Sequence, residues 1–99
     1  MAAYMVVNAR VDDLVQFGKY VEAVQPVIAA HGGKLIGRGV PPVVLEGDWP
    51  YQTVGVLEFP SVEAAQMFWD SPEYKAVKRL RDGAAVFQVI VADATSVVI

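Results

Sequence analysis

The sequence predicts an α+β domain whose strands and helices follow one another in the order β-α-β-β-α-β. Three observations lead to this prediction. Apolar and polar residues alternate over residues 3–11, as on the two faces of a strand. Apolar residues then recur at spacings of three and four over 14–28, which is typical of one buried helical face. Finally, β-branched residues dominate 85–93, which favours a closing strand.

The first half of the chain predicts a strand, a helix and a turn. After the strand at 3–11, Asp12 or Asp13 is expected to cap a helix. Gly18 weakens this helix and Pro26 removes one of its hydrogen bonds, so we expect a bend near 22–26 rather than two helices. The sequence His31-Gly32-Gly33 ends it, because glycine readily adopts the left-handed conformation of a helix end. The apolar stripe consists of Leu14, Phe17, Val21, Val24 and Ile28.

The second half predicts the remaining strands and a divided helical segment. Residues 34–39 and 52–59 read as strands, with a short strand or ribbon at 43–47 between them. Ser61 is expected to cap a helix at 62–70, and Ser71 with Pro72 to start a second segment at 72–83. This gives two short helices or one broken helix before the strand at 85–93. The apolar tail 94–99 would aggregate if it were free, so we expect it to be buried against a second copy.

Composition excludes several classes of protein. The 99 residues suit a single domain, 1–99, and with 55% hydrophobic and 19% charged residues the chain is globular. A net charge of −3 argues against nucleic-acid binding, and the lack of cysteine removes disulfides and thiolate chemistry. The start of the chain lacks the pattern of a signal peptide, and no apolar run is long enough to span a membrane. A cytoplasmic location is therefore expected, with no membrane partner.

The predicted order also predicts an oligomer. Right-handed crossovers place both helical layers on one face of a four-stranded antiparallel sheet, which is the ferredoxin-like arrangement. The other face would carry Val6, Val54 and Val56, which are too apolar to leave in water. We therefore expect a homodimer in which two copies pack sheet to sheet.

Five short motifs in order also resemble a known family. They are 38-RG-39, 45-LEGDW-49, 57-LEFPS-61, 71-SPEYK-75 and 80-LRDGA-84. Together they are similar to the domain of unknown function numbered 1330, within the dimeric α/β-barrel superfamily. The resemblance implies a ferredoxin-like protomer whose sheet faces that of a partner, and it implies no established reaction. Relatives in the superfamily, such as muconolactone isomerases and cofactor-free monooxygenases, act on small organic molecules in a pocket beside the sheet.

One group of candidate site residues is expected where strands one and two end and strand three begins. Arg10 and Arg38 should meet the connection that carries Glu46, Asp48 and Trp49. In a structural interpretation, one of the two acids pairs with Arg38 while Trp49 covers the barrel mouth or reaches the partner. In a functional interpretation, Arg38 anchors a carboxylate substrate and Trp49 forms a pocket wall.

A second group is expected at the opposite end of the sheet. There Tyr4 and Glu58 should approach the end of the first helix, which bears His31. Histidine changes charge near neutral pH, and Glu58 would hold its ring in one tautomer, so the pair is a candidate for acid–base catalysis. The alternative is that His31 only stabilises the helix end and Glu58 only accepts a hydrogen bond from a loop.

Other features are expected to be structural. Phe68, Trp69 and Tyr74 have the spacing of a helical core, and the basic residues of 75–81, which end at Arg81, read as an exposed helix face. The glycines form no phosphate-binding motif, so no nucleotide cofactor is expected. One histidine and no cysteine do not supply a metal site, so no metal is expected either.

Two functions remain open. The first is a cofactor-independent enzyme or binder for a small organic acid or aromatic metabolite. The second is a non-catalytic structural or regulatory homodimer. The first is favoured because Asn8, Arg10, Glu58 and Gln88 place polar groups on otherwise apolar strands, as a ligand pocket would.

Overall fold

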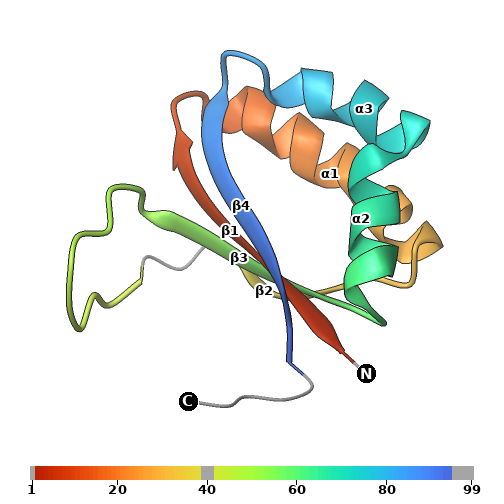
Figure 1. Ribbon diagram of the computed structural model, residues 1–99. Helices are drawn as coiled ribbons and strands as arrows, with labels where there is room; N and C mark the ends of the chain where they lie inside the picture. Colours follow the sequence, from red (N-terminus) through yellow and green to blue (C-terminus); the bar gives the residue numbers. More distant parts are fainter. Residues whose placement is uncertain (1, 39–41, 95–99) are drawn as a thin grey trace.

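The computed structural model describes residues 2–38 and 42–94, which form a sheet with helices against one face (Figure 1). The elements in chain order are β1 (Ala3–Val11), α1 (Leu14–Ala30), β2 (Lys34–Arg38), β3 (Thr53–Phe59), α2 (Val62–Asp70), α3 (Pro72–Lys78), the 3-10 turn η1 (Arg79–Arg81) and β4 (Ala85–Asp93). The predicted order is confirmed. The second helical segment is divided into two helices and a 3-10 turn, and α1 continues as one helix through Pro26.

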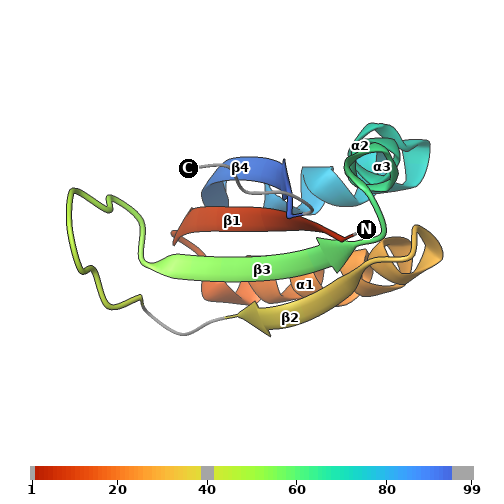
Figure 2. The ribbon, with the colours of Figure 1, turned by 60° about the horizontal axis from the view of Figure 1, so that its bottom comes forward.

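The strands lie in the order β2-β3-β1-β4, and every neighbouring pair is antiparallel. Figure 2 shows β1 in the middle, with β3 on one side and β4 on the other. The sheet edges are therefore β2 and β4. Both helical layers lie on the same face, as predicted from the handedness of the crossovers (Figure 1).

Alternation along the strands separates a helix-covered face from an open face. Met5 of β1 is paired with Leu57 of β3, and both side chains are buried under the helices. Their neighbours point to the other side of the sheet, because successive side chains of a strand alternate. None of the described helices covers that side (Figure 1). This open face is formed by Tyr4, Val6 and Asn8 of β1, Val54, Val56 and Glu58 of β3, and Gln88 and Ile90 of β4.

Side-chain caps begin the three α-helices at the residues expected from the sequence. The Asp13 carboxylate accepts a hydrogen bond from the Gln16 N–H at 3.1 Å. The Ser61 and Ser71 hydroxyls accept from N–H groups in the first turns of α2 and α3, at 3.0 and 3.1 Å. At the other end of α1, Gly32 has a φ of 76°, which a residue with a side chain rarely adopts. The chain therefore leaves α1 where the glycine pair predicts.

An aromatic cluster joins the sheet to α2 and α3. The ring of Phe68 lies 5.3 Å from that of Phe59 and 4.7 Å from that of Tyr74, measured between centroids. All three side chains are buried, which confirms that Phe68 and Tyr74 belong to the core. Gly33 allows the close approach of β2, because a Cβ atom there would lie 2.7 Å from Phe59.

Two sequence-based expectations are corrected. Residues 42–52 contain no strand, so the strand predicted at 43–47 is wrong. Pro42 and Pro50 lack the N–H groups that a ladder needs, and the connection projects beyond the sheet (Figure 1). Arg81 was expected on an exposed face but is buried, because η1 turns it toward the core.

The predicted burial of the tail concerns residues 95–99, which lie outside the described residues; Ala94 still donates its N–H to the carbonyl of Ala2, at 3.1 Å. None of the helices in the described ranges is long and apolar enough to cross a bilayer.

Candidate functional site

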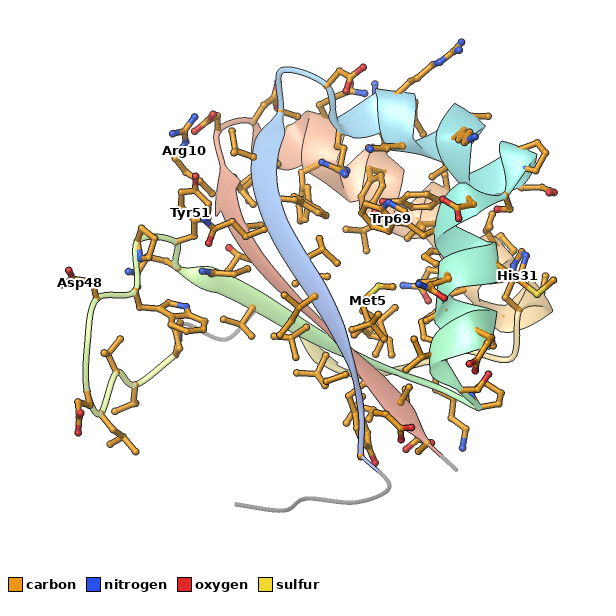
Figure 3. All side chains as sticks on the ribbon, in the orientation of Figure 1. Met5, Arg10, His31, Asp48, Tyr51 and Trp69 are labelled. Carbon is orange, nitrogen blue, oxygen red and sulfur yellow. The ribbon has the colours of Figure 1, made fainter. Side chains whose placement is uncertain are left out.

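A cavity of about 770 Å³ lies between the helix-covered face of the sheet and the helices. Figure 3 shows Met5 of β1 and Trp69 of α2 reaching into this region from opposite sides. Most of the residues that line the cavity are apolar or aromatic, and they come from both the sheet and the helices. They include Met5 and Val7 of β1, Phe17, Tyr20 and Val24 of α1, Leu57 of β3, Trp69 of α2, Tyr74 of α3 and Phe87 of β4.

The sequence forms this cavity because small residues of the sheet face large residues of α1. Val7, Ala9 and Gly55 form part of the sheet floor. A Cβ atom placed on Gly55 would meet nothing closer than 3.9 Å, so the floor is not filled there. The stripe of α1 is spaced so that Phe17, Tyr20 and Val24 point toward the same floor. The space between the two layers is therefore left open.

A hydrogen-bonded pair of tyrosines is the main polar feature of the wall. The hydroxyl oxygens of Tyr20 and Tyr74 lie 3.0 Å apart, and both side chains are buried. Burial raises the pKa of Tyr20 far above its ordinary value, and Tyr74 adds to this rise. Tyr20 is therefore neutral at physiological pH and has a proton to donate.

Arg81 lies behind this pair as a buried cation. Its side chain is 9% exposed, and its guanidinium carbon lies 3.9 Å from the ring centroid of Phe87 and 5.8 Å from that of Tyr20. Its Nε–H has no hydrogen-bond partner, and within the described ranges no carboxylate lies within 4.0 Å of its nitrogens. The positive charge of Arg81 opposes this rise in the pKa of Tyr20.

Charge at the cavity is sparse. Among the described residues that line it, Glu22 is the only charged one, and that side chain is exposed. Gln25 and Thr53 add neutral polar groups. No lysine or arginine of the described residues lines the wall, so nothing there pairs directly with a carboxylate ligand.

The members of the first sequence-predicted group whose side chains are described, Arg10, Glu46, Asp48 and Trp49, do not line the cavity. Figure 3 shows Arg10 at the end of β1, on the side of the molecule where the connection carries Asp48. Arg10 donates from Nε and Nη2 to the Asp12 carboxylate, at 3.1 and 3.2 Å, and this pairing raises the pKa of Arg10. Glu46 and Asp48 are exposed, and Trp49 is 42% exposed.

The pairing predicted for Arg38 stays a prediction. In the register of the sheet, Arg38 lies opposite Gly55, so the predicted meeting of the ends of β1 and β2 with the start of β3 is present in the backbone. The side chain of Arg38 lies outside the description. No ion pair to Arg10 from Glu46 or Asp48 occurs among the described residues.

His31 and Glu58 are not brought together. Leu57 and Phe59 are buried under the helices, so Glu58 between them points to the open face, where its Oε2 accepts from the Tyr4 hydroxyl at 3.2 Å. His31 lies on the helix side, with its ring 5.9 Å from that of Phe68. Its Nδ1–H donates to the Val27 carbonyl at 2.9 Å. The sheet separates the two residues, which removes the geometry needed for a shared acid–base role.

Asn8 also belongs to the open face. Its side chain is 7% exposed, and its Oδ1 has no hydrogen-bond partner. Across the sheet it lies between Val54 and Gln88. Of the sequence-predicted site residues whose side chains are described, none lines the cavity.

Sequence reasoning missed the two tyrosines of the wall and the arginine behind them. Tyr74 was assigned only to the core, and Arg81 only to the surface. Tyr20 is three residues after Phe17 and four before Val24, so it shares their stripe. A tyrosine in a buried stripe needs a partner for its hydroxyl, and this signal points to Tyr20.

Comparison with known proteins shows the family and the fold. Residues 2–95 match the family described as Domain of unknown function (DUF1330), which confirms the resemblance predicted from the motifs. Among curated proteins, none matches the sequence.

Several solved structures are similar. RPA0582, a protein of unknown function from Rhodopseudomonas palustris, has 22% sequence identity and a TM-score of 0.76, over 96% of this chain and 83% of that chain. A dimeric protein of unknown function and ferredoxin-like fold from Bacteroides fragilis has 14% identity and a TM-score of 0.63, over 93% and 95%. SnoaB, a cofactor-independent oxygenase from Streptomyces nogalater, has 11% identity and a TM-score of 0.66, over 97% and 95%. At these identities the likeness shows the fold, and the predicted ferredoxin-like arrangement is confirmed.

Proposed function

The chain belongs to the DUF1330 family, and on that premise we propose that it binds a small molecule in the cavity between the sheet and the helices. The observation that carries the proposal is the cavity itself, with a volume of about 770 Å³ and a wall of apolar and aromatic side chains. Ligand sites typically have volumes of about 300–1,000 Å³ and such walls, with a few polar groups that fix orientation. Here the hydroxyls of Tyr20 and Tyr74 are those groups.

The wall favours an aromatic metabolite over a small organic acid. An organic acid would bring a full carboxylate charge to a wall on which Glu22 is the only described charged residue. Like charges repel, and an apolar wall penalises an unpaired ion. A flat aromatic ligand, in contrast, can contact the rings of Phe17, Trp69 and Phe87.

We extend the proposal to a reaction that needs no cofactor. Two observations support it: the fold is shared with SnoaB, whose reaction is cofactor-independent, and one histidine with no cysteine makes a metal set hard to build. Fold likeness is an analogy and assigns no residue. The residues of this chain that would orient the substrate are Tyr20 and Tyr74.

A dye-binding experiment tests the binding site. N-phenyl-1-naphthylamine is an uncharged aromatic dye whose fluorescence rises in apolar surroundings. We expect saturable binding to the wild type and at least a tenfold loss of affinity in Val7→Phe, which fills the floor of the cavity. Ala29→Phe is the matched control, because Ala29 is exposed on α1 and does not line the cavity.

The same experiment separates the two functions left open by the sequence. If the dye does not bind, or if Val7→Phe binds as well as the wild type, the cavity is not the site and the non-catalytic homodimer becomes the better interpretation. A thermal-shift screen of aromatic metabolites then identifies the ligand class. A panel in which only carboxylates raise the midpoint would contradict the aromatic proposal.

We also propose that a second copy covers the open face. Val6 and Val56 lie side by side in the middle of that face, and Ile90 beside them is 64% exposed. The Bacteroides fragilis protein with the same fold is dimeric. An interface of at least the usual total area, about 1,600 Å², is expected.

Light scattering after size exclusion tests the dimer. The wild type should elute with the mass of two chains, and Val56→Glu should yield a monomer, because it places a charge in the middle of the proposed interface. Lys75→Glu, on the exposed side of α3, is the control. A folded wild-type monomer at micromolar concentration would rule out this interface.

A further inference from the structure

The mouth of the cavity lies between α1 and the sheet edge formed by β2. The residues that line the cavity and are also exposed mark this opening: Leu14, Gly18, Glu22 and Gln25 of α1 and Leu35 of β2. The four residues of α1 follow one another at spacings of four, four and three, so they form one line along the helix. That line is one rim of the mouth.

Glu22 is a free carboxylate in the middle of this rim. Within the described ranges, no lysine, arginine or histidine nitrogen lies within 4.0 Å of its oxygens. Lys19, three residues earlier on α1, does not line the cavity. The sheet lines the mouth with uncharged residues, which are Leu35 of β2 and Thr53 and Gly55 of β3. The charge that the described residues place at the mouth is therefore negative.

Space for a ligand group is open beside this carboxylate. Gly18 lies one turn before Glu22 on the same rim, and a Cβ atom added there would meet nothing within 4 Å. Gln25 lies three residues after Glu22 and also lines the cavity, with an amide oxygen that can accept a hydrogen bond. An ammonium group has three donors and no acceptor, so a carboxylate beside an amide oxygen suits it.

The interior of the cavity favours the same charge. The rings of Phe17, Trp69 and Phe87 line it, and the face of an aromatic ring attracts a cation. An anion is instead repelled by Glu22 and finds no lysine or arginine on the wall that the described residues form. Mouth and interior therefore select for a positive charge together.

We infer that the ligand is an arylalkylamine in its protonated form, with the ammonium group beside Glu22 and the aromatic ring inside the cavity. Glu22 then determines specificity, because it distinguishes the amine from a neutral molecule with the same ring. The inference rests on the proposed function, because it places the ligand in the same cavity, and it adds the charge of the substrate class to that proposal. Exposed ion pairs contribute modestly, so the expected preference is about three- to tenfold.

Three probes that share one naphthalene ring test the inference. Near neutral pH, 1-naphthylmethylamine is a cation, 1-naphthylmethanol is neutral and 1-naphthaleneacetate is an anion. Their affinities are measured by displacement of N-phenyl-1-naphthylamine. At low ionic strength the wild type should bind the amine about three- to tenfold more tightly than the alcohol, and the anion more weakly than either. Because salt screens exposed charges, this preference should fall below about twofold in about 0.5 M sodium chloride.

Variants at one position assign the preference to the mouth. Glu22→Gln removes the charge and keeps the size of the side chain, so the ratio of the amine and alcohol affinities should fall to about one. Glu22→Lys should reverse the order, so that the anion binds more tightly than the amine. Glu63→Gln is the matched control, because it makes the same change of charge at an exposed position of α2 that does not line the cavity. It should keep the wild-type preference.

The outcomes separate this inference from the proposed function. Equal binding of the amine and the alcohol by the wild type overturns the inference and leaves the cavity as a binding site. A preference that persists in Glu22→Gln also overturns it, because the rings alone then select the cation. An equal loss in Glu63→Gln assigns the preference to the net charge of −3 and not to the mouth. A dye that binds but is displaced by none of the probes overturns the inference alone. If the dye does not bind, the proposed function fails, and this inference fails with it.

Discussion

The hydroxyl pair of Tyr20 and Tyr74 predicts a measurable coupling between two mutations. Tyr20→Phe leaves the Tyr74 hydroxyl buried without its partner, and Tyr74→Phe does the same to Tyr20. An orphaned buried polar group costs about 1–3 kcal/mol, whereas removing both partners together is nearly neutral. The double variant should cost at least about 1 kcal/mol less than the sum of the two single variants.

Urea unfolding at fixed protein concentration is the assay, with Trp69 fluorescence as the signal in a Trp49→Phe background, which removes the other tryptophan. The Trp69 ring centroid lies 4.9 Å from that of Tyr74 and therefore reports on this region. A coupling of about 1 kcal/mol corresponds to roughly 4–8 °C in the thermal midpoint for a domain of this size. Tyr4→Phe with Tyr74→Phe is the control cycle, because the sheet separates these residues and their effects should add. A Tyr20–Tyr74 coupling below about 0.3 kcal/mol, with unchanged m-values, would refute the hydrogen bond as a stabilising contact.

Three further predictions concern stability. Tyr20 keeps its proton in the folded state, whereas the unfolded chain releases it above the ordinary pKa of 10.0. Above pH 10 the free energy of unfolding of the wild type should therefore fall by about 1.4 kcal/mol per pH unit more than that of Tyr20→Phe. Parallel curves of unfolding free energy against pH for the two proteins would contradict this. Gly33→Ala should lower the free energy of urea unfolding by about 1–3 kcal/mol, because the added Cβ atom clashes with Phe59. Gly18→Ala should instead stabilise the protein by up to about 1 kcal/mol, because Gly18 lies in a helix and an added Cβ atom there meets nothing within 4 Å. Equal effects of the two substitutions would show that the clash at Gly33 relaxes. Deletion of residues 95–99 should lower the thermal midpoint and make it more dependent on concentration, and no change in either would contradict the predicted burial of the tail.

The fold was predictable because each element carries local signals. Asp13, Ser61 and Ser71 cap their helices where a short polar side chain precedes an apolar period. The alternation over Ala3–Val11 assigns Met5 to the core and Tyr4 to the open face before any contact is known. The error at residues 43–47 arose because apolar residues alone do not make a strand. A strand needs a neighbour, and Pro42 and Pro50 remove N–H groups from that segment.

The candidate site was less predictable because it depends on distances between elements. Sequence reasoning correctly placed Arg10 beside the connection and Tyr4 beside Glu58, since antiparallel pairing fixes which strand ends meet. Sequence reasoning also grouped His31 with Glu58. The order of the strands predicts which end of the sheet each residue lies at, but not whether the helix terminus and the strand side chain lie on the same face of the sheet. The two lie on opposite sides of the sheet.

By itself, the sequence determined the strand and helix order, the capped helix starts and the aromatic core, because these follow from neighbours within a few residues. Only the tertiary structure decided that the cavity lies above Gly55, that Tyr20 meets Tyr74 and that Arg81 is buried behind them. Tyr20 and Tyr74 are 54 residues apart, and their meeting depends on how α3 and η1 return to α1. A local pattern fixes the direction of a side chain within its own element, whereas the packing of whole elements fixes the group that it meets.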